Sequence, residues 1–209
     1  MTDLAPEAPR RLSKGERTRA RLLDSATELF ARSGYLAVSL RDIAAHAGLT
    51  HAGLLHHFPG KEALLLDVLS LRDEVDGRRL FPGALAPGDP EPEPAERLRL
   101  LLEVVTRNAG TPGLVALYAK LSAEASDPEH PAHLYFVRRY QILRRELTGL
   151  LAELFAAADV REDPAAAAQQ LLALMDGLQT QWLLEPDAVD MAEQVRAFLR
   201  RYGVRAERG

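Results

Sequence analysis

The chain has 209 residues and a formal net charge of −4, with 47% hydrophobic and 27% charged residues. This balance is typical of a globular protein with its own core, and it excludes a disordered or fibrous chain. The sequence contains no cysteine, no apolar run of about 18 residues and no secretory signal pattern, so we expect a protein of the cytoplasm without disulfides or membrane spans.

Charge is distributed unevenly along the chain. Through residue 61, nine Lys or Arg stand against six Asp or Glu, a net of +3, whereas residues 62–209 carry 17 against 24, a net of −7. A basic head on an acidic body suits a protein that approaches a polyanion with its N-terminal part alone, although a charged run is also typical of a solvated surface. We assign residues 1–12 to a disordered basic N-terminal tail.

Residues 10–30 predict an amphipathic helix that begins at a capping box. Ser13 and Glu16 have the spacing at which each side chain accepts a hydrogen bond from the other residue's backbone. Arg17 lies near the exposed N-terminal end of this helix. The predicted buried stripe consists of Leu22, Leu23, Ala26, Leu29 and Phe30.

Residues 39–61 predict two short helices around a tight turn, which is the layout of a helix-turn-helix DNA reader. Ser39 and Asp42 form a second capping box, Gly48 suits the left-handed conformation that ends a helix, and Thr50 can cap the next helix, which runs to about residue 57. The apolar residues expected to return to the core are Leu54, Leu55 and Phe58. The same spacing also fits an ordinary helical hairpin.

Three histidines, His51, His56 and His57, stand close together in this segment. Their separations do not give the i, i+4 pairing that places two imidazoles on one helical face. His130 and His133 flank Pro131, which indicates the start of a helix instead. We therefore expect no metal site and no cofactor.

From residue 62 on, composition and periodicity predict an all-α body. Alanine, leucine, glutamate and arginine dominate, and no strand-like alternation persists. Helices are expected at about residues 62–80, 94–109, 112–126, 132–158, 164–185 and 188–202. Five prolines in residues 81–94 predict a stiff surface connector or a partly disordered loop. The expected domains are a DNA-binding domain at 13–61 and a helical ligand-binding and dimerisation domain at 62–209.

The two long helices expected at 132–158 and 164–185 carry more apolar residues than one core-facing stripe requires. Small residues beside larger apolar ones could allow the helices of two chains to approach closely. These residues are Ala166, Ala167 and Ala173, beside Leu172, Met175, Leu178, Gln179 and Trp182. The alternative is that both helices are the core of a monomer.

Residues 17–69 resemble the N-terminal domain of the TetR family of bacterial transcriptional regulators. The matching elements, in the family's order, are Leu29-Phe30, Gly34-Tyr35, Ser39, Arg41-Asp42-Ile43-Ala44, Ala47-Gly48, His56-His57-Phe58 and Lys61-Glu62-Ala63-Leu64. Leu55 stands where the family usually has a tyrosine, His57 where it has an aromatic residue, and Ala52 where it has a glycine. Near the C-terminus, Met175 to Gln179, Trp182 and Pro186-Asp187 are similar to the end of one TetR subgroup.

The resemblance implies an all-α, TetR-like fold with a three-helix DNA-binding head and a helical body. It implies a homodimer through the helices near 132–158 and 164–185, which binds double-stranded operator DNA and an unknown small-molecule effector. Together with helix positions, it makes the following residues candidates for DNA contact: Arg17, Ser39, Arg41, Thr50, His51, Gly53, His56, His57 and Lys61. The candidates for lining an effector cavity are Tyr118, Tyr135, Arg138, Gln179 and Trp182.

The expected roles differ among the DNA-contact candidates. A guanidinium at Arg41 can bind guanine O6 and N7, whereas Lys61 is placed for phosphate contact. We expect a repressor released by its effector, although an activator or a regulator that answers to a protein partner fits the same fold. No catalytic spacing such as a glycine-rich phosphate loop occurs, so an enzyme is not expected.

Overall fold

The computed structural model describes residues 13–85, 90 and 92–205, and all regular elements in these ranges are helices. In chain order they are α1 (Lys14–Ser33), α2 (Leu40–His46), α3 (His51–Leu55), α4 (Lys61–Leu80), α5 (Pro82–Leu85), α6 (Pro94–Ala109), α7 (Pro112–Glu124), α8 (His133–Ala157), α9 (Pro164–Leu184) and α10 (Met191–Arg201). The all-α prediction is confirmed. The tail expected at residues 1–12 lies outside the described residues.

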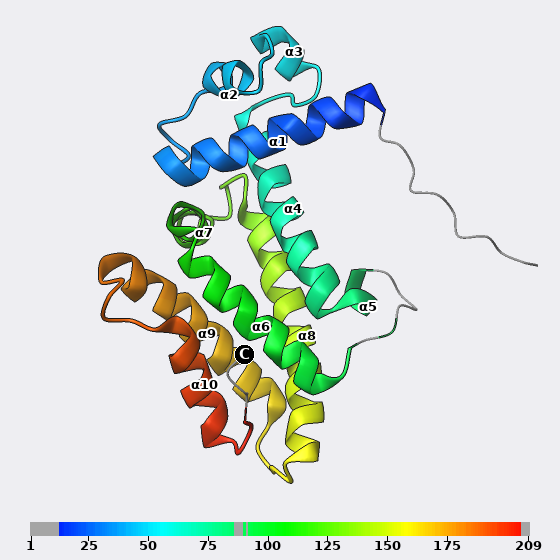
Figure 1. Ribbon diagram of the computed structural model, residues 1–209, viewed down its shortest axis with the longest axis vertical. Helices are drawn as coiled ribbons and strands as arrows, with labels where there is room; N and C mark the ends of the chain where they lie inside the picture. Colours follow the sequence, from blue (N-terminus) through cyan, green and yellow to red (C-terminus); the bar gives the residue numbers. More distant parts are fainter. Residues whose placement is uncertain (1–12, 86–89, 91, 206–209) are drawn as a thin grey trace, which may run out of the picture.

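A small head of three helices, α1 to α3, stands at one end of an elongated body, and α4 runs from the head into the body (Figure 1). The predicted stripe of α1 is buried, with Leu22 and Phe30 fully enclosed. They pack with Ile43 of α2 and Leu54 of α3, so the head is built around the face that the helical periodicity of α1 predicted.

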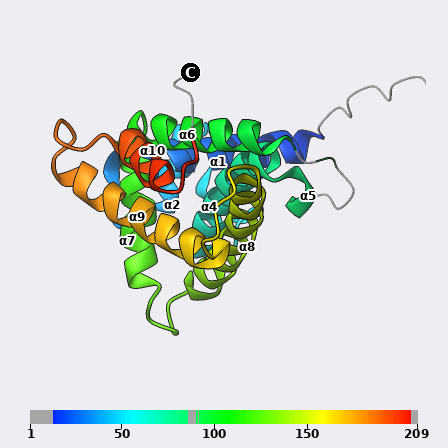
Figure 2. The ribbon, with the colours of Figure 1, turned by 90° about the horizontal axis from the view of Figure 1, so that it is seen from below.

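The body consists of α4 and the helices that follow it. α8 and α9 form one side of it, and α6 and α10 form the other (Figure 2). Its core is a continuous cluster of aliphatic and aromatic side chains that includes Leu101, Leu151, Leu171 and Val195. No helix in the described part of the chain is both long and apolar enough to cross a membrane.

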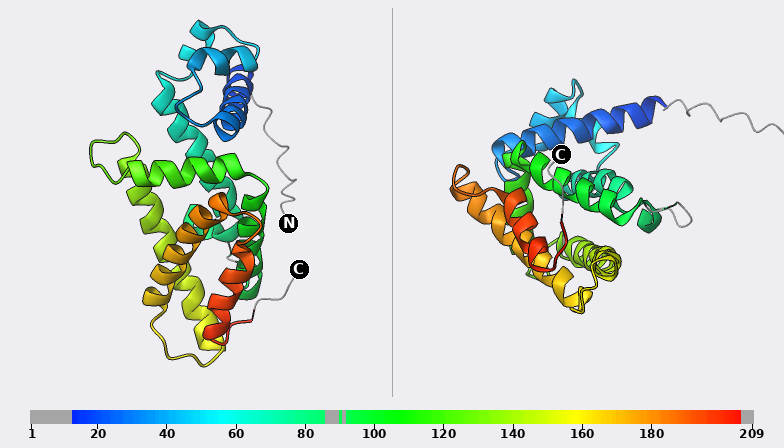
Figure 3. Two further views of the ribbon diagram at one scale, coloured as in Figure 1. Left: turned by 90° about the vertical axis from the view of Figure 1, so that its left-hand side faces the viewer. Right: turned by 60° about the horizontal axis from the view of Figure 1, so that its bottom comes forward.

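Head and body meet at α7, which lies beneath α1 (Figure 3, left). Leu114, Leu117 and Leu121 of α7, with Phe136 of α8, belong to the same hydrophobic cluster as the core of the head. The head therefore rests on α7 through continuous apolar packing, in addition to its covalent link through α4.

Two expectations about the body need correction. A short helix, α5, lies where a connector without helix was expected, because Pro82 at its first position supplies a backbone angle suited to a helix start. Within α9, Ala167, Leu172, Leu178 and Trp182 are buried in the core of the single chain, so these side chains do not face a second chain.

Candidate nucleic-acid interface

The helix-turn-helix is held by local hydrogen bonds at both helix starts. The Ser39 hydroxyl accepts the Asp42 backbone N–H at 3.2 Å, and the Asp42 carboxylate accepts the Ser39 backbone N–H at 2.8 Å. The Thr50 hydroxyl accepts the Gly53 backbone N–H at 3.0 Å. Gly48, in the turn, has φ +66°, in the left-handed region that favours glycine. The predicted caps and turn are confirmed.

These hydrogen bonds also set the charge of Asp42. Hydrogen bonds from the Ser39 side chain and backbone lower the pKa of the Asp42 carboxyl, which keeps it ionised at the N-terminus of α2. A carboxylate there compensates the exposed backbone amides of the first turn.

The second helix of the helix-turn-helix, α3, buries one side and exposes the other. Leu54 and Phe58 are 0% and 1% exposed, whereas Leu55 is 43% exposed. The expectation that Leu55 returns to the core is wrong. Adjacent residues on a helix point about 100° apart, so once Leu54 and Phe58 occupy the core, Leu55 must turn outward. The outer face of the segment presents His51, Ala52, Leu55 and His56.

Lys61 opens α4 and connects it to the loop between α1 and α2. Its ammonium lies 4.3 Å from the centre of the Tyr35 ring and donates a hydrogen bond of 3.4 Å to the Leu36 carbonyl oxygen. Burial lowers the pKa of Lys61, and Asp42 opposes this shift. The charge is therefore fixed at the end of the molecule that also carries α2 and α3 (Figure 1).

The structure brings most of the DNA-contact candidates to this same end. Arg41 is exposed on α2, and His57 is half-buried just after α3. Arg17 is exposed in the first turn of α1. The candidates gathered on α2, α3 and their flanks are Ser39, Arg41, Thr50, His51, Gly53, His56, His57 and Lys61.

One supporting residue of the head was not anticipated from the sequence. The Arg19 guanidinium of α1 lies 5.0 Å from the centre of the Phe58 ring and forms an ion pair with Asp67 of α4. It thereby holds Phe58, which follows α3, against α1 and α4. The basic character of α1 was visible in the sequence, but nothing there pointed to Phe58 as a partner.

In the body, two of the five effector candidates meet around a carboxylate on α4. The Tyr135 hydroxyl donates to Asp73 at 2.5 Å, and Arg139 Nε donates to the two Asp73 oxygens at 2.9 and 3.2 Å. The Tyr118 hydroxyl donates to the Leu69 carbonyl oxygen at 2.8 Å, and the Arg139 guanidinium lies 5.1 Å from the centre of the Tyr118 ring. We call Asp73, Tyr118, Tyr135 and Arg139 the Asp73 cluster.

The Asp73 cluster joins three helices, since Asp73 belongs to α4, Tyr118 to α7, and Tyr135 and Arg139 to α8. Burial raises the pKa of both tyrosines, and the negative charge of Asp73 raises it further, so both hydroxyls remain hydrogen-bond donors at neutral pH. The Arg139 guanidinium compensates the Asp73 charge in this partly buried setting.

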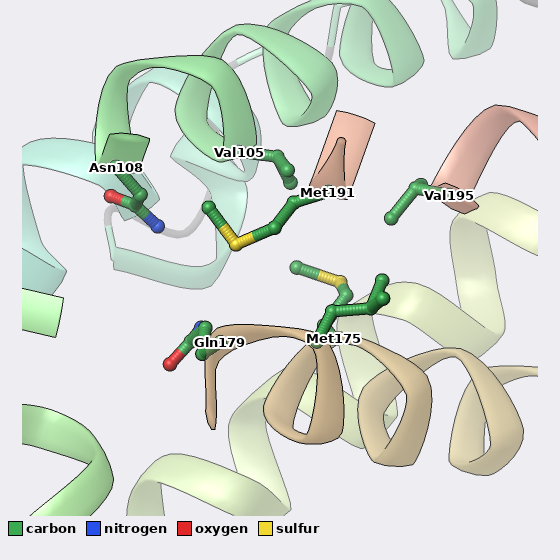
Figure 4. A pocket seen from close by; sticks show the side chains of 7 residues that line it. Val105, Asn108, Met175, Gln179, Met191 and Val195 are labelled. Atoms are coloured by element: carbon green, nitrogen blue, oxygen red, sulfur yellow. The ribbon is translucent and has the colours of Figure 1, made fainter. Parts of the chain in front are cut away.

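The other three effector candidates lie elsewhere. Arg138 is exposed on α8, and Trp182 is in the core cluster. Gln179 lines a small cavity between α6, α9 and α10 (Figure 4). The other side chains around this cavity are Val105, Asn108, Met175, Leu178, Met191 and Val195. Its volume of about 10 Å³ has room for roughly one water molecule.

A second polar pair lies between α8 and α9. The Tyr140 hydroxyl donates to Asp176 at 2.8 Å. Burial raises the pKa of Asp176, whereas the hydrogen bond from Tyr140 and the charge of Arg139 act in the opposite direction. Within the described ranges, no group of three or more His, Cys, Asp or Glu side chains has an arrangement suited to a metal ion.

Family models match both parts of the chain. The model described as "Bacterial regulatory proteins, tetR family" matches residues 22–68, and the model described as "BetI-type transcriptional repressor, C-terminal" matches residues 94–205. The first range contains the helix-turn-helix, and the second contains α6 to α10.

This chain aligns with individual relatives over most of their length. The HTH-type transcriptional regulator AcrR of Shigella flexneri is 24% identical, with 89% of this chain and 87% of the relative covered. The HTH-type transcriptional regulator BetI of Rhizobium meliloti is 28% identical, with 85% and 83% covered.

Solved structures show the same fold. A transcriptional regulator from Saccharomonospora viridis in complex with choline is 25% identical, with a TM-score of 0.68 and 88% of this chain and 96% of that chain covered. A TetR-family regulator from Streptomyces coelicolor is also 25% identical, with a TM-score of 0.67 and 92% and 97% covered. These relatives are all named as transcriptional regulators. The chain belongs to the TetR family of bacterial regulatory proteins and is a DNA-binding transcriptional regulator.

Proposed function

We propose that the protein is a homodimeric repressor that binds a palindromic operator and releases it when a small molecule binds its body. The observation that carries the proposal is the course of α4, which begins at Lys61 against the loop between α1 and α2 and bears Asp73 within the body. Asp73 lies 12 positions after Lys61, which corresponds to about 18 Å of helix. One helix therefore links the DNA-reading end to a polar cluster shared with α7 and α8.

The proposed DNA contacts divide into two kinds. Arg41, His51 and Gly53 approach base edges, because α3 and the exposed side of α2 enter the major groove. Phosphate contacts fix the register on the duplex and come from Arg17, Ser39, Thr50, His56, His57 and Lys61.

The proposed dimer forms through α8 and α9. Leu134 and Ile142 of α8 and Leu184 of α9 are exposed large apolar side chains, and Ala173 and Gly177 present small exposed surfaces on α9. Exposed apolar residues on two adjacent helices favour burial against a second copy. A two-fold dimer would present two heads to the two halves of a palindrome.

The proposed effector site is the Asp73 cluster, and the proposed effector class is a small organic cation. The cluster already holds a cation, since the Arg139 guanidinium pairs with Asp73 and lies over the Tyr118 ring. The choline complex of the Saccharomonospora viridis regulator supports the same class. A cation that replaces Arg139 beside Asp73 changes how α4 is held, which shifts the population of DNA-binding dimers.

Three measurements test this proposal. Light scattering of the full chain at micromolar concentration should give the mass of a dimer, and a monomer mass contradicts the proposed assembly.

Expression of a reporter driven by the gene's own promoter should fall when the protein is present, whereas a rise in reporter expression supports the activator alternative. Choline or tetramethylammonium should lower operator affinity for the unmodified chain and not for Asp73→Asn, and no effect on either chain contradicts the effector class.

A further inference from the structure

The outer face of α3 combines apolar and imidazole side chains. Leu55 is 43% exposed, and Ala52, three residues earlier on the same face, is also exposed. His51 and His56 flank them. Single exposed leucines are ordinary on protein surfaces, but this one lies on the helix that faces DNA in a helix-turn-helix regulator.

The packing of α3 fixes the direction of Leu55. Leu54 and Phe58 are fully enclosed in the core of the head, and the Arg19 guanidinium covers the Phe58 ring at 5.0 Å. The Thr50 cap holds the start of the helix. Because these contacts set the rotation of a helix only five residues long, Leu55 cannot turn inward without removing Leu54 from the core.

The chemistry of an exposed leucine limits what it can read in a major groove. Its side chain neither donates nor accepts hydrogen bonds, so placing it against a polar base edge removes water without replacing the lost hydrogen bonds. The 5-methyl group of thymine is the apolar feature that the major groove offers. A leucine and a neighbouring alanine on one face provide an apolar surface matched to that group.

We propose that Leu55, supported by Ala52, is a specificity-determining residue that selects thymine in each half-site through contact with its 5-methyl group. This inference rests on the proposed insertion of α3 into the major groove. It adds a base preference that the hydrogen-bonding residues of the head do not supply. Leu55 thus acts by excluding bases that lack an apolar edge, while Lys61 and the capped helix starts hold the register.

The test uses deoxyuridine, which pairs as thymine does but lacks the methyl group. A tight-binding duplex is first selected with the full chain from a pool of randomised duplexes. Each thymine of the selected duplex is then replaced singly by deoxyuridine, and affinity is measured by fluorescence anisotropy. Burial of one methyl group predicts a loss of about fourfold at one or two positions in each half-site.

Variants assign that loss to Leu55. Leu55→Ala should bind the thymine and deoxyuridine duplexes within about twofold of each other, because the leucine surface that contacts the methyl group has been removed. Leu36→Ala is the matched control, since Leu36 is 85% exposed in the same head but lies in the loop before α2, and this variant should keep the full discrimination.

The outcomes separate the two proposals. A selected duplex that binds tightly but tolerates deoxyuridine at every position overturns the methyl contact and leaves operator binding intact. Unchanged discrimination in Leu55→Ala overturns the assignment to Leu55. Failure to enrich any duplex overturns both the insertion of α3 and the inference built on it.

Discussion

Gly113 of α7 lies directly against the backbone of Ala31 in α1, so that a Cβ atom at position 113 would stand 1.3 Å from the Ala31 carbonyl oxygen. Since α1 belongs to the head and α7 to the body, two backbones meet where the head rests on the body. This approach requires glycine because the obstructing atoms are backbone atoms, which cannot rotate away as a side chain can.

Gly113→Ala should therefore separate α1 from α7 and lower the free energy of unfolding by about 1–3 kcal/mol, the usual cost of overpacking. Urea unfolding measures this loss. Gly15→Ala is the matched control, because the nearest atom to its Cβ would be the Ser13 hydroxyl oxygen at 3.9 Å. It should leave stability unchanged or raise it slightly. Equal stability of both variants contradicts the close contact.

Asp73→Asn should destabilise the body, because it removes the charge partner of Arg139 and weakens the acceptor for Tyr135. We expect a loss of about 1–3 kcal/mol in urea unfolding, below the cost of breaking a fully buried pair because both side chains keep some exposure. Combining it with Tyr135→Phe should cost less than the sum of the single changes. Asp24 is exposed on α1, and Asp24→Asn is the control. Strict additivity of Asp73→Asn and Tyr135→Phe argues against a shared cluster.

Asp176 should make stability depend on pH. Burial raises its pKa in the folded chain, so the folded state binds more protons than the unfolded state between the two pKa values. The contribution of Asp176 to the free energy of unfolding therefore falls as the pH rises from its pKa in the unfolded chain to its raised pKa in the folded chain. Asp176→Asn should be more stable than the parent at pH 7, with the difference shrinking toward pH 3. Asp187→Asn, which makes the same change on an exposed loop, is the matched control.

Lys61→Ala and Arg41→Ala should affect DNA binding differently. Loss of a phosphate contact at Lys61 should weaken binding to every duplex and reduce the slope of log affinity against log salt by about one. Loss of a base contact at Arg41 should weaken the operator selectively. Anisotropy titrations on operator and random duplexes at several salt concentrations distinguish the two. Equal losses on both duplexes for Arg41→Ala contradict its assignment to a base.

Local interactions explain why the head could be predicted in detail from the sequence. The capping boxes and the left-handed glycine depend on residues at most three positions apart, and they occur where predicted. The prediction that Leu55 lies in the core was wrong, because two adjacent leucines leave the rotation of a short helix undetermined until Phe58 is packed. The Asp73 pair could not be predicted, since Arg139 lies 66 residues away and only the packing of α4 on α8 brings the two together.

The most direct test of the account is whether a dimer binds a palindrome. Two duplexes are titrated with the full chain at several salt concentrations: a selected operator, and the same duplex with one half-site scrambled. We predict tight binding to the intact palindrome with a steep salt dependence and a large loss of affinity on the single half-site. Equal affinity for the two duplexes would contradict a dimeric reader.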